Sequence, residues 1–189
     1  MSDIIIVRAE EKDAELIAII SRETFYDTYA ALNTAANMSK FLTLQFSKSM
    51  LMKEVSAVDN YFFLAYKNGE VAGYVKLKES IHPQLKGEKA IEISRIYVCK
   101  PFIGKGIGKA LLQAAIDFAK EQLNDWIWLI AWKENKRAID FYQKNGFETS
   151  SHHPRCQTSV KPDFPTKRNP DFSRICRHIA ILLSPAIQS

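Results

Sequence analysis

The sequence predicts a mixed α/β fold, in which a mainly antiparallel sheet carries helices on both faces. Two observations lead to this prediction. Strand-like runs on both sides of Asn68-Gly69 predict a hairpin, because this pair suits a tight turn with positive φ. From residue 90 to residue 146, strand and helix patterns then alternate. Hairpins followed by strand–helix alternation are typical of a mixed sheet.

The separate elements follow from hydrophobic periodicity. The apolar, β-branched run at 3–9 predicts a buried strand, and the run at 126–132 predicts a strand buried on both faces. Alternation predicts a strand at 90–98 and the two hairpin strands within 61–80. Apolar residues at three- and four-residue spacing predict helices at 12–30, 37–56, 109–123 and 135–146. The last of these helices is closed by Gly146.

The last 39 residues differ in composition from the rest. The 189 residues, 47% of them hydrophobic, suit a single domain over 1–189. Residues 151–189, however, hold five of the seven prolines, and six Lys and Arg against two Asp, so only +1 of the net +5 belongs to residues 1–150. In this atypical Pro-rich basic segment we expect a closing strand at 175–184, with 151–160 as its partner and an irregular loop at 161–174. This closing strand would pair with the sheet of its own chain or, by exchange, with the sheet of a second copy in a homodimer.

Composition also bears on location and partners. The sequence contains no stretch of about 18 apolar residues, so we expect no membrane span. The acidic N-terminus does not resemble a signal peptide. Three cysteines without a framework favour a reducing compartment, so we expect a cytoplasmic protein. No basic run is interleaved with aromatic residues, so we expect no nucleic-acid partner. We also expect no metal, because no familiar site has the spacing of His152, His153, Cys156, Cys176 and His178.

Three glycines stand between the strand at 90–98 and the helix that follows. Gly104, Gly106 and Gly108 would let an anion approach the backbone. The first turn of a helix has unpaired N–H groups and partial positive charge, so the junction suits a pyrophosphate. A Walker loop does not fit, because Ile103 and Ala110 stand where Gly and Ser or Thr are needed. The spacing is also wrong for a dinucleotide fingerprint. A plain strand-to-helix turn is the alternative that the glycines leave open.

Two motifs at this junction and after it resemble the GNAT superfamily of N-acetyltransferases. The loop motif [RQ]-x-x-G-x-[GA] is matched at residues 103–108, except that Ile103 replaces its Arg or Gln. The motif N-x-x-A-x-x-F-Y-x-x-x-G-F is complete at residues 135–147. More specifically, residues 3–149 resemble the bacterial PaiA-type spermine/spermidine N-acetyltransferases, and the likeness fades after Glu148. The resemblance implies the GNAT fold and transfer of an acetyl group to an amine.

The resemblance implies acetyl-CoA as co-substrate. Its pyrophosphate would lie on the backbone N–H groups of Gly104, Lys105, Gly106, Ile107, Gly108 and Lys109. Its pantetheine arm would pair, like an added strand, with the backbone of Ile96, Tyr97 and Val98. Asn135 would bond the pantetheine as well as cap the last helix, although helix capping alone would explain its presence.

The resemblance also implies catalytic roles. An alkylamine has a pKa of about 10.4, so a base must remove a proton before it can attack. The candidate is Glu92, and Ser94 on the same strand face would hold a water. The N–H of Ile96 would stabilise the oxyanion, and Tyr142 would donate to the departing thiolate. A solvated strand carboxylate is the alternative for Glu92, and core packing for Tyr142.

The acceptor would be a small-molecule amine held by the end of the first helix. Aromatic rings and a carboxylate suit a cationic amine, and this region supplies Phe25, Tyr26, Asp27 and Tyr29. Core packing is again the alternative. The leading hypothesis is a polyamine. A protein N-terminus, a lysine, an amino acid or an aminoglycoside would be other acceptors. An acetyl-CoA-binding regulator with little catalysis is the non-enzymatic hypothesis, which Ile103 and Ser94 favour and Asn135 and Tyr142 oppose.

Overall fold

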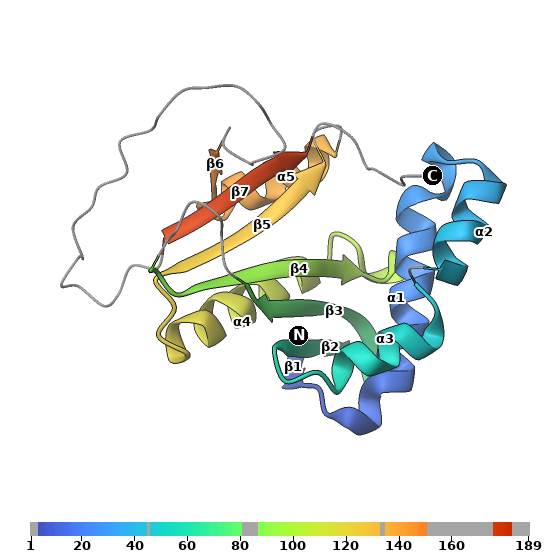
Figure 1. Cartoon of the computed structure of the whole chain (residues 1–189), viewed down its shortest axis with the longest axis horizontal. Helices are drawn as coiled ribbons and strands as arrows, with labels where there is room; N and C mark the ends of the chain where they lie inside the picture. The colour runs from blue at the N-terminus through green and yellow to red at the C-terminus, as the bar shows by residue number, and fades with distance from the viewer. Residues whose placement is uncertain (1–3, 45, 81–86, 133–134, 151–175, 183–189) are drawn as a thin grey trace. The chain divides into compact units, whose positions relative to one another are not determined.

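The computed structural model describes residues 4–44, 46–80, 87–132, 135–150 and 176–182 (Figure 1). For residues 32, 132, 150 and 176–182 it describes the backbone alone. The described chain forms two compact units. The first holds residues 4–79 and 93–115, and the second holds residues 80–92 and 116–182.

The first unit is built on an antiparallel hairpin with a strand on each side. Its strands are β1 Ile4–Arg8, β2 Asn60–Lys67, β3 Glu70–Glu79 and most of β4 Ala90–Val98, in the order β1-β2-β3-β4. β2 pairs antiparallel with both β1 and β3. The turn between β2 and β3 has φ of 55° at Asn68 and 81° at Gly69, as the sequence predicts.

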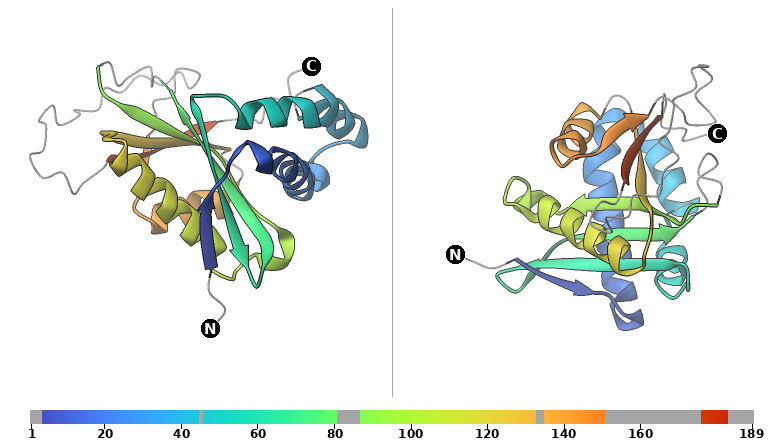
Figure 2. Two further views of the ribbon diagram at one scale, coloured as in Figure 1. Left: turned by 90° about the horizontal axis from the view of Figure 1, so that it is seen from below. Right: turned by 90° about the vertical axis from the view of Figure 1, so that its left-hand side faces the viewer.

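Helices α1 Ala14–Tyr29 and α3 Lys48–Val55 lie along one face of this hairpin, with α2 Ala35–Leu44 before α3 (Figure 2). Short 3-10 turns complete the chain, namely η1 Glu11–Asp13, η2 Ala30–Leu32 and η3 Lys100–Phe102. The prediction of one helix over 37–56 is wrong. The Ser47 side chain accepts from the N–H of Met50 and starts a new helix, while Phe46 is buried between the two helices.

Residues 3–9 were predicted to form a buried strand, and the prediction of burial is wrong. The strand exists, but the Ile5 and Val7 side chains are 58% and 39% exposed. β1 lies at the end of the strand order, so one of its edges has no neighbouring strand and its side chains have fewer neighbours than those of a central strand. The β-branched composition that suggested burial reflects strand propensity instead.

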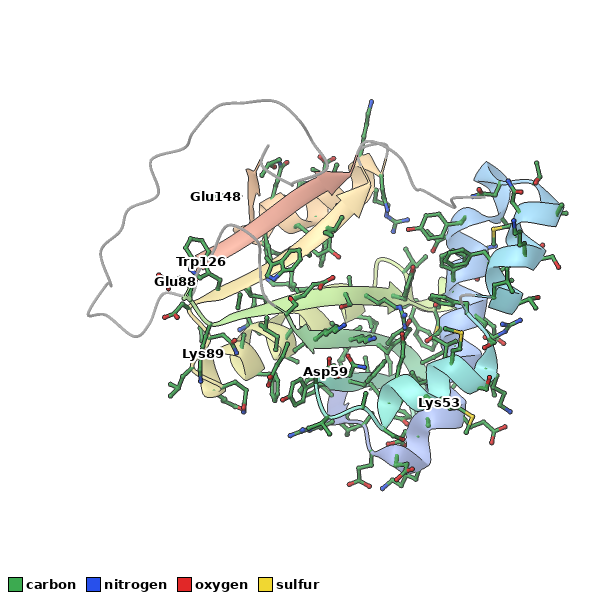
Figure 3. All side chains as sticks on the ribbon, in the orientation of Figure 1. Lys53, Asp59, Glu88, Lys89, Trp126 and Glu148 are labelled. Carbon is green, nitrogen blue, oxygen red and sulfur yellow. The ribbon has the colours of Figure 1, made fainter. Side chains whose placement is uncertain are left out.

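The second unit holds β5 Trp126–Trp132, β6 Glu148–Ser150, β7 Cys176–Leu182 and helix α5 Lys136–Lys144. β7 lies between β5 and β6 and runs parallel to both, which confirms the prediction of a closing strand at 175–184. The start of β5 is fixed by the Lys89 carbonyl, which accepts from the N–H groups of Asp125 and Trp126. Figure 3 labels Lys89 and Trp126. The predicted partner strand at 151–160 and the loop at 161–174 lie outside the described residues.

Helix α4, Ile107–Glu121, begins directly after the glycine stretch and runs from residues of the first unit into residues of the second. It begins and ends two residues before the predicted 109–123, and α5 lies within the predicted 135–146. Gly146 has a φ of 82° just beyond α5, as a glycine that closes a helix should.

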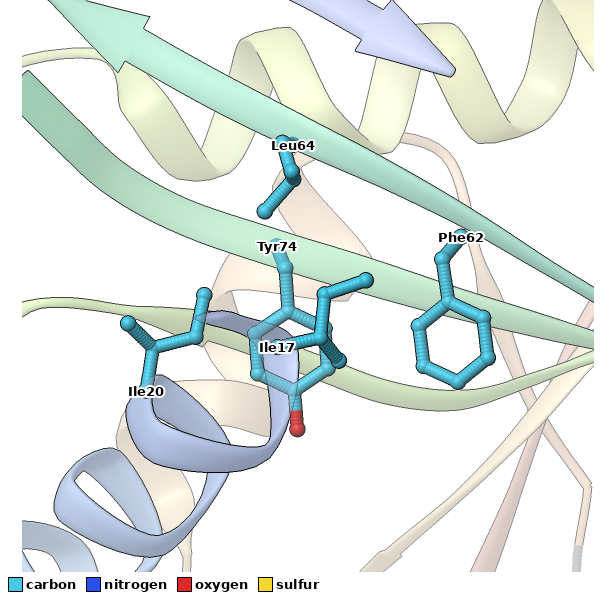
Figure 4. Packing of buried hydrophobic residues seen from close by; sticks show 5 residues of the cluster. All are labelled: Ile17, Ile20, Phe62, Leu64 and Tyr74. Carbon is cyan, nitrogen blue, oxygen red and sulfur yellow. The ribbon is translucent and has the colours of Figure 1, made fainter. Parts of the chain in front are cut away.

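The core of the first unit lies between α1 and the hairpin (Figure 4). Ile17 and Ile20 of α1 pack against Phe62 and Leu64 of β2 and against Tyr74 of β3, and all five side chains are at most 3% exposed. Burial of one such side chain contributes about 1.5–3 kcal/mol relative to leaving it in water. This packing fixes α1 against the sheet, and with it the aromatic end of α1.

Candidate active site

The glycine stretch between β4 and α4 is exposed to solvent. Gly104 and Gly106 have φ of 82° and 86°, which residues with side chains rarely adopt, so the turn itself requires glycine here. A Cβ on Gly104 would meet nothing within 4 Å, and one on Gly106 would meet only the Ile4 side chain, at 3.5 Å. The space beside both glycines is therefore open to a ligand.

The backbone donors predicted for an anion are not equivalent. The N–H groups of Ile107, Gly108 and Lys109 form the first turn of α4 and have no acceptor within the helix. The helix dipole adds partial positive charge at the same place. The N–H of Lys105, in contrast, donates to the Phe102 carbonyl at 3.2 Å. The first turn of α4 is thus the stronger part of the predicted site, and Lys105 the weaker part.

Lys67 reaches this loop from the end of β2. Its ammonium group donates to the Lys105 carbonyl at 3.5 Å, and the Lys105 ammonium lies 5.5 Å from the centre of the Phe102 ring. Two cations therefore border a loop that already suits an anion. Ile103, which replaces the Arg or Gln of the loop motif, is 42% exposed and has no side-chain hydrogen-bond donor. Sequence reasoning missed Lys67, because its position beside a hairpin turn does not indicate a contact 38 residues away.

At the end of β4, the backbone groups of successive residues point to the two opposite edges of the strand. The N–H of Cys99 donates to the Ala72 carbonyl of β3 at 2.9 Å. Along an extended strand, the N–H and C=O groups of successive residues point to opposite edges. Tyr97 therefore points its backbone groups toward β3, and Ile96 and Val98 point theirs away from it. Of the three residues predicted to pair with a pantetheine arm, Ile96 and Val98 have the suitable orientation.

The Tyr97 side chain lies on the face of β4 that α1 covers. It packs against the same core cluster as the Tyr29 side chain, and its ring centre is 5.9 Å from that of Tyr74. Burial raises the pKa of Tyr97 well above its ordinary value and raises that of Tyr74 to about 12, so both phenols are protonated at neutral pH. The end of α1 thus shares a core cluster with β4 through Tyr29, a residue that the sequence assigned to the acceptor site.

The other three residues assigned to the acceptor site divide between core and surface. The Phe25 ring is 8% exposed and lies 4.6 Å from that of Phe41 and 4.8 Å from that of Phe46. This placement favours the packing hypothesis for Phe25. Tyr26, which is 52% exposed, and Asp27 face solvent.

A second carboxylate accompanies Asp27. Glu23 and Asp27 are exposed and lie one helical turn apart on α1. Burial raises the pKa of the Cys99 thiol, and the negative charges of Glu23 and Asp27 raise it further. The two carboxylates therefore act electrostatically on Cys99, where the chain leaves β4 for the glycine stretch. Sequence reasoning named Asp27 but missed Glu23.

Three charged residues meet on the α3 side of β3 and β4. Arg95 donates two hydrogen bonds to the Glu54 carboxylate, at 2.6 and 2.9 Å, and the Lys76 ammonium lies 3.3 Å from the same group. The Arg95 guanidinium also lies 4.6 Å from the centre of the Phe46 ring. Lys76 is only 5% exposed, and burial lowers its pKa. This cluster fixes Arg95 beside Ile96, and no pattern in the sequence pointed to it.

Glu92 and Ser94, the predicted base and its water-holding neighbour, lie on β4 as expected. Both are half-buried, and they alternate with the buried side chains of Ile91 and Ile93, which are 0% and 3% exposed. Partial exposure is compatible with proton transfer to water, so the residues stay candidates.

The motif around α5 folds as a capped helix with a buried aromatic group. The Asn135 side chain accepts from the N–H of Ala138 at 3.1 Å, so the capping role is present. Tyr142 is 7% exposed, and its ring centre lies 5.3 Å from that of Phe141 and 5.7 Å from that of Phe147. Packing and catalysis are both compatible with this placement. Asn135 and Tyr142 belong to the second unit, whereas the glycine stretch belongs to the first.

Two further findings concern only the described ranges. None of the helices there combines the length and apolar character that a bilayer crossing requires. No three His, Cys, Asp or Glu side chains gather there as a metal site would need. The side chains of the five His and Cys residues considered for zinc lie outside what the structure describes.

Comparison with known proteins identifies the family of this chain. The sequence model of the acetyltransferase (GNAT) family matches residues 22–147. An N-acetyltransferase of Lactobacillus delbrueckii subsp. lactis, itself called uncharacterized, is 35% identical over 159 residues, which is 81% of this chain and 89% of that protein. Spermidine N(1)-acetyltransferase of Thermoplasma acidophilum is 28% identical over 141 residues, or 72% of this chain and 83% of that enzyme.

Solved structures agree with the sequence comparison. The PaiA N-acetyltransferase of Thermoplasma acidophilum, crystallised with coenzyme A, superimposes with a TM-score of 0.67 at 26% identity, covering 80% of this chain and 93% of that one. The resemblance to PaiA-type enzymes stated from the sequence is thus confirmed, as is the fold class. The chain therefore belongs to the acetyltransferase (GNAT) family and is an N-acetyltransferase.

Proposed function

We propose that this N-acetyltransferase transfers the acetyl group of acetyl-CoA to a primary amine of a polyamine such as spermidine or spermine. The observation that carries the proposal is the junction of β4 and α4. Its open glycine stretch, the free N–H groups of the first helical turn and the outward backbone of Ile96 and Val98 suit a pyrophosphate followed by an amide-bearing arm.

The pyrophosphate and the pantetheine arm of the cofactor each have a counterpart in the first unit. The pyrophosphate would lie on the first turn of α4, beside the Lys67 and Lys105 ammonium groups. The pantetheine amides would pair with Ile96 and Val98 on the edge away from β3. The coenzyme A bound to the Thermoplasma PaiA enzyme supports this assignment. The sequence resemblance assigns a further pantetheine contact to the Asn135 side chain.

The reaction would proceed by direct attack in a ternary complex. Glu92, directly or through a water held by Ser94, takes a proton from the ammonium group, and the freed nitrogen attacks the thioester carbonyl carbon. The Ile96 N–H stabilises the oxyanion. When the C–S bond breaks, Tyr142 donates to the thiolate, and the nitrogen releases its second proton to water. The products are CoA and an N-acetylated amine.

The exposed carboxylates at the end of α1 support a cationic acceptor. The charges of Glu23 and Asp27 act on the thiol of Cys99 at the end of β4, and the exposed Tyr26 ring stands between the two carboxylates in sequence. Carboxylates and an aromatic ring are the groups that favour ammonium ions. The name of the Thermoplasma spermidine enzyme supports the same acceptor class. A cytoplasmic location and a homodimer are further proposals, which rest on the cysteine usage and on the sequence of the tail.

A panel of acceptors tests the proposal. Purified full-length protein and acetyl-CoA are mixed with spermidine, spermine, lysine, an amino acid amide, an N-terminal peptide and an aminoglycoside, and thiol release is followed. We expect kcat/KM for the polyamines to exceed that of every other amine at least about tenfold, a difference of about 1.4 kcal/mol. A preference for another amine would refute the polyamine assignment. CoA binding without turnover of any amine would instead favour the regulator hypothesis.

A further inference from the structure

A glycine in the middle of β3 has no local reason to be a glycine. Gly73 does not have a positive φ, so its backbone suits any residue. Within a strand, glycine is destabilising relative to alanine, because it loses more conformational freedom on folding. A glycine at such a position often marks the close approach of another backbone.

The neighbouring strand supplies that approach. A Cβ placed on Gly73 would lie 2.4 Å from the Tyr97 carbonyl oxygen and 3.1 Å from the Val98 Cα. Ordinary contact begins at 3.4 Å, so an alanine would push these atoms away by about 1 Å. The atoms displaced are backbone atoms, which cannot move aside by rotating a side chain.

A β-bulge lies directly beside Gly73. Ala65 of β2 is opposite Gly73 and Tyr66 is opposite Val71, so Ala72 is the extra residue of β3. The carbonyl of this extra residue is the one that accepts from the N–H of Cys99. Bulges bend a strand and redirect what it carries. Ala72 and Gly73 together thus hold the last residues of β4 against β3.

We propose that Gly73 positions the cofactor-binding end of β4, so that Ile96 and Val98 present their backbone groups to the pantetheine arm in the correct place. The proposal rests on the proposed function, because it takes acetyl-CoA as the ligand. Gly73 touches no substrate in this account. It acts through Tyr97 and Val98, whose backbone would shift if the strand contact widened.

The consequence is specific to one part of the ligand. A shift of β4 should weaken the contacts of the pantetheine arm but leave the first turn of α4 free to bind phosphates. Two misaligned backbone hydrogen bonds should cost about tenfold in affinity. A displacement of about 1 Å should also lower kcat, by up to roughly a hundredfold, because the thioester would be held out of line with the amine.

The test compares two ligands and two variants of the full-length protein. Calorimetry measures the Kd of CoA and of 3′-phosphoadenosine 5′-diphosphate, which is CoA without its pantetheine arm. For Gly73→Ala we expect the Kd of CoA to rise about tenfold and that of the fragment to change less than twofold. The control Lys78→Ala changes an exposed residue near the other end of β3 without adding an atom near Tyr97, so its CoA affinity should stay within twofold of the wild type.

The outcomes separate the two proposals. If the wild type binds no CoA, the proposed function fails. If the wild type binds CoA and Gly73→Ala binds it equally well, this inference alone is overturned. Equal losses for CoA and the fragment would also overturn it, because they indicate general damage to the fold.

A measurement on the wild type decides the case in which Gly73→Ala does not fold. Amide hydrogen exchange, followed by NMR, should show Tyr97 and Cys99 protected without ligand, because their N–H groups face β3. Ile96 and Val98 should gain protection only when CoA binds. Protection of Ile96 and Val98 that CoA does not change would contradict the proposal.

Discussion

The two sides of the proposed active site are built from different groups. The cofactor side, at the junction of β4 and α4, consists mainly of backbone N–H groups and of glycines that expose them. The acceptor side, at the end of α1, consists of side chains such as Glu23, Tyr26 and Asp27. Backbone groups are kept whatever the side chains become, so Ile103 can replace an Arg or Gln without removing the site. Side chains can change singly, so the acceptor side is where specificity can diverge between relatives.

The largest effect is expected on the cofactor side. Gly106→Glu should abolish CoA binding, because a carboxylate would stand beside the pyrophosphate and a side chain would be strained at a φ of 86°. Calorimetry with CoA measures this. The matched control is Gly87→Glu, which adds the same charge at a φ of 83° elsewhere and should keep the affinity of the wild type. Unchanged affinity in Gly106→Glu would show that the phosphates bind elsewhere.

The next largest effect concerns the leaving group. Tyr142→Phe keeps the ring that packs beside Phe141 and Phe147 but removes the hydroxyl. We expect kcat to fall by roughly 10²–10⁴, the usual range for a general acid, with little change in CoA affinity. Single-turnover kinetics isolate the chemical step. Tyr61→Phe, which removes an exposed hydroxyl bonded to Glu79, serves as control. Wild-type single-turnover rates in Tyr142→Phe would mean that the phenol only packs.

A smaller effect concerns the frame that both sides share. Glu54→Gln leaves the Arg95 and Lys76 cations without their carboxylate, which should cost about 1–3 kcal/mol of unfolding free energy given the partial exposure of the pair. Denaturant unfolding measures this. Glu15→Gln, which removes the exposed partner of Lys48, should cost nothing measurable. Equal stability of Glu54→Gln and the wild type would mean that the cluster is only a surface feature.

The same ion pair predicts a dependence on pH. Burial acts to raise the pKa of Glu54, but the hydrogen bonds and charges of Arg95 and Lys76 together outweigh it, so the pKa lies below the ordinary 4.5. The folded state thus binds this proton more weakly than the unfolded chain does. The stabilisation is therefore complete above about pH 4.5 and is lost as the pH falls through the lowered pKa of the folded protein. The difference in stability between wild type and Glu54→Gln should shrink in that acid range. A difference that is constant with pH would rule this out.

The sequence predicted most elements because their patterns are local. The hairpin at Asn68-Gly69, the strand at 90–98 and the helix capped by Asn135 depend on neighbouring residues, and the structure agrees with them. The break between α2 and α3 was also local, since Ser47 is a good N-cap, but the apolar periodicity on both sides concealed it. The exposure of β1 could not be predicted, because it depends on the strand order.

The site was predictable where it follows a motif and not where it depends on tertiary contacts. The glycine stretch and the Asn135–Tyr142 motif could be recognised by their spacing. The contact of Lys67 with the loop, and the ion pair of Glu54 with Arg95, join residues 38 and 41 positions apart. Gly73 did carry a signal, since a glycine inside a strand pattern suggests a close backbone approach. The sequence pattern thus indicated that a backbone approaches Gly73, but it did not indicate which strand this is.

The measurement that tests the account most directly is the double variant Glu23→Gln/Asp27→Asn, with both substrates varied in steady-state kinetics. Partly exposed ion pairs contribute up to about 1 kcal/mol each, so kcat/KM for spermidine should fall about tenfold. The KM for acetyl-CoA should not change, because the backbone holds the cofactor. The control Glu10→Gln/Glu15→Gln makes the same change in net charge ahead of α1 and in its first turn, and should leave both values unaltered. A double variant that acetylates spermidine as well as the wild type, or that loses acetyl-CoA instead, would contradict the division between a backbone-built cofactor side and a side-chain-built acceptor side.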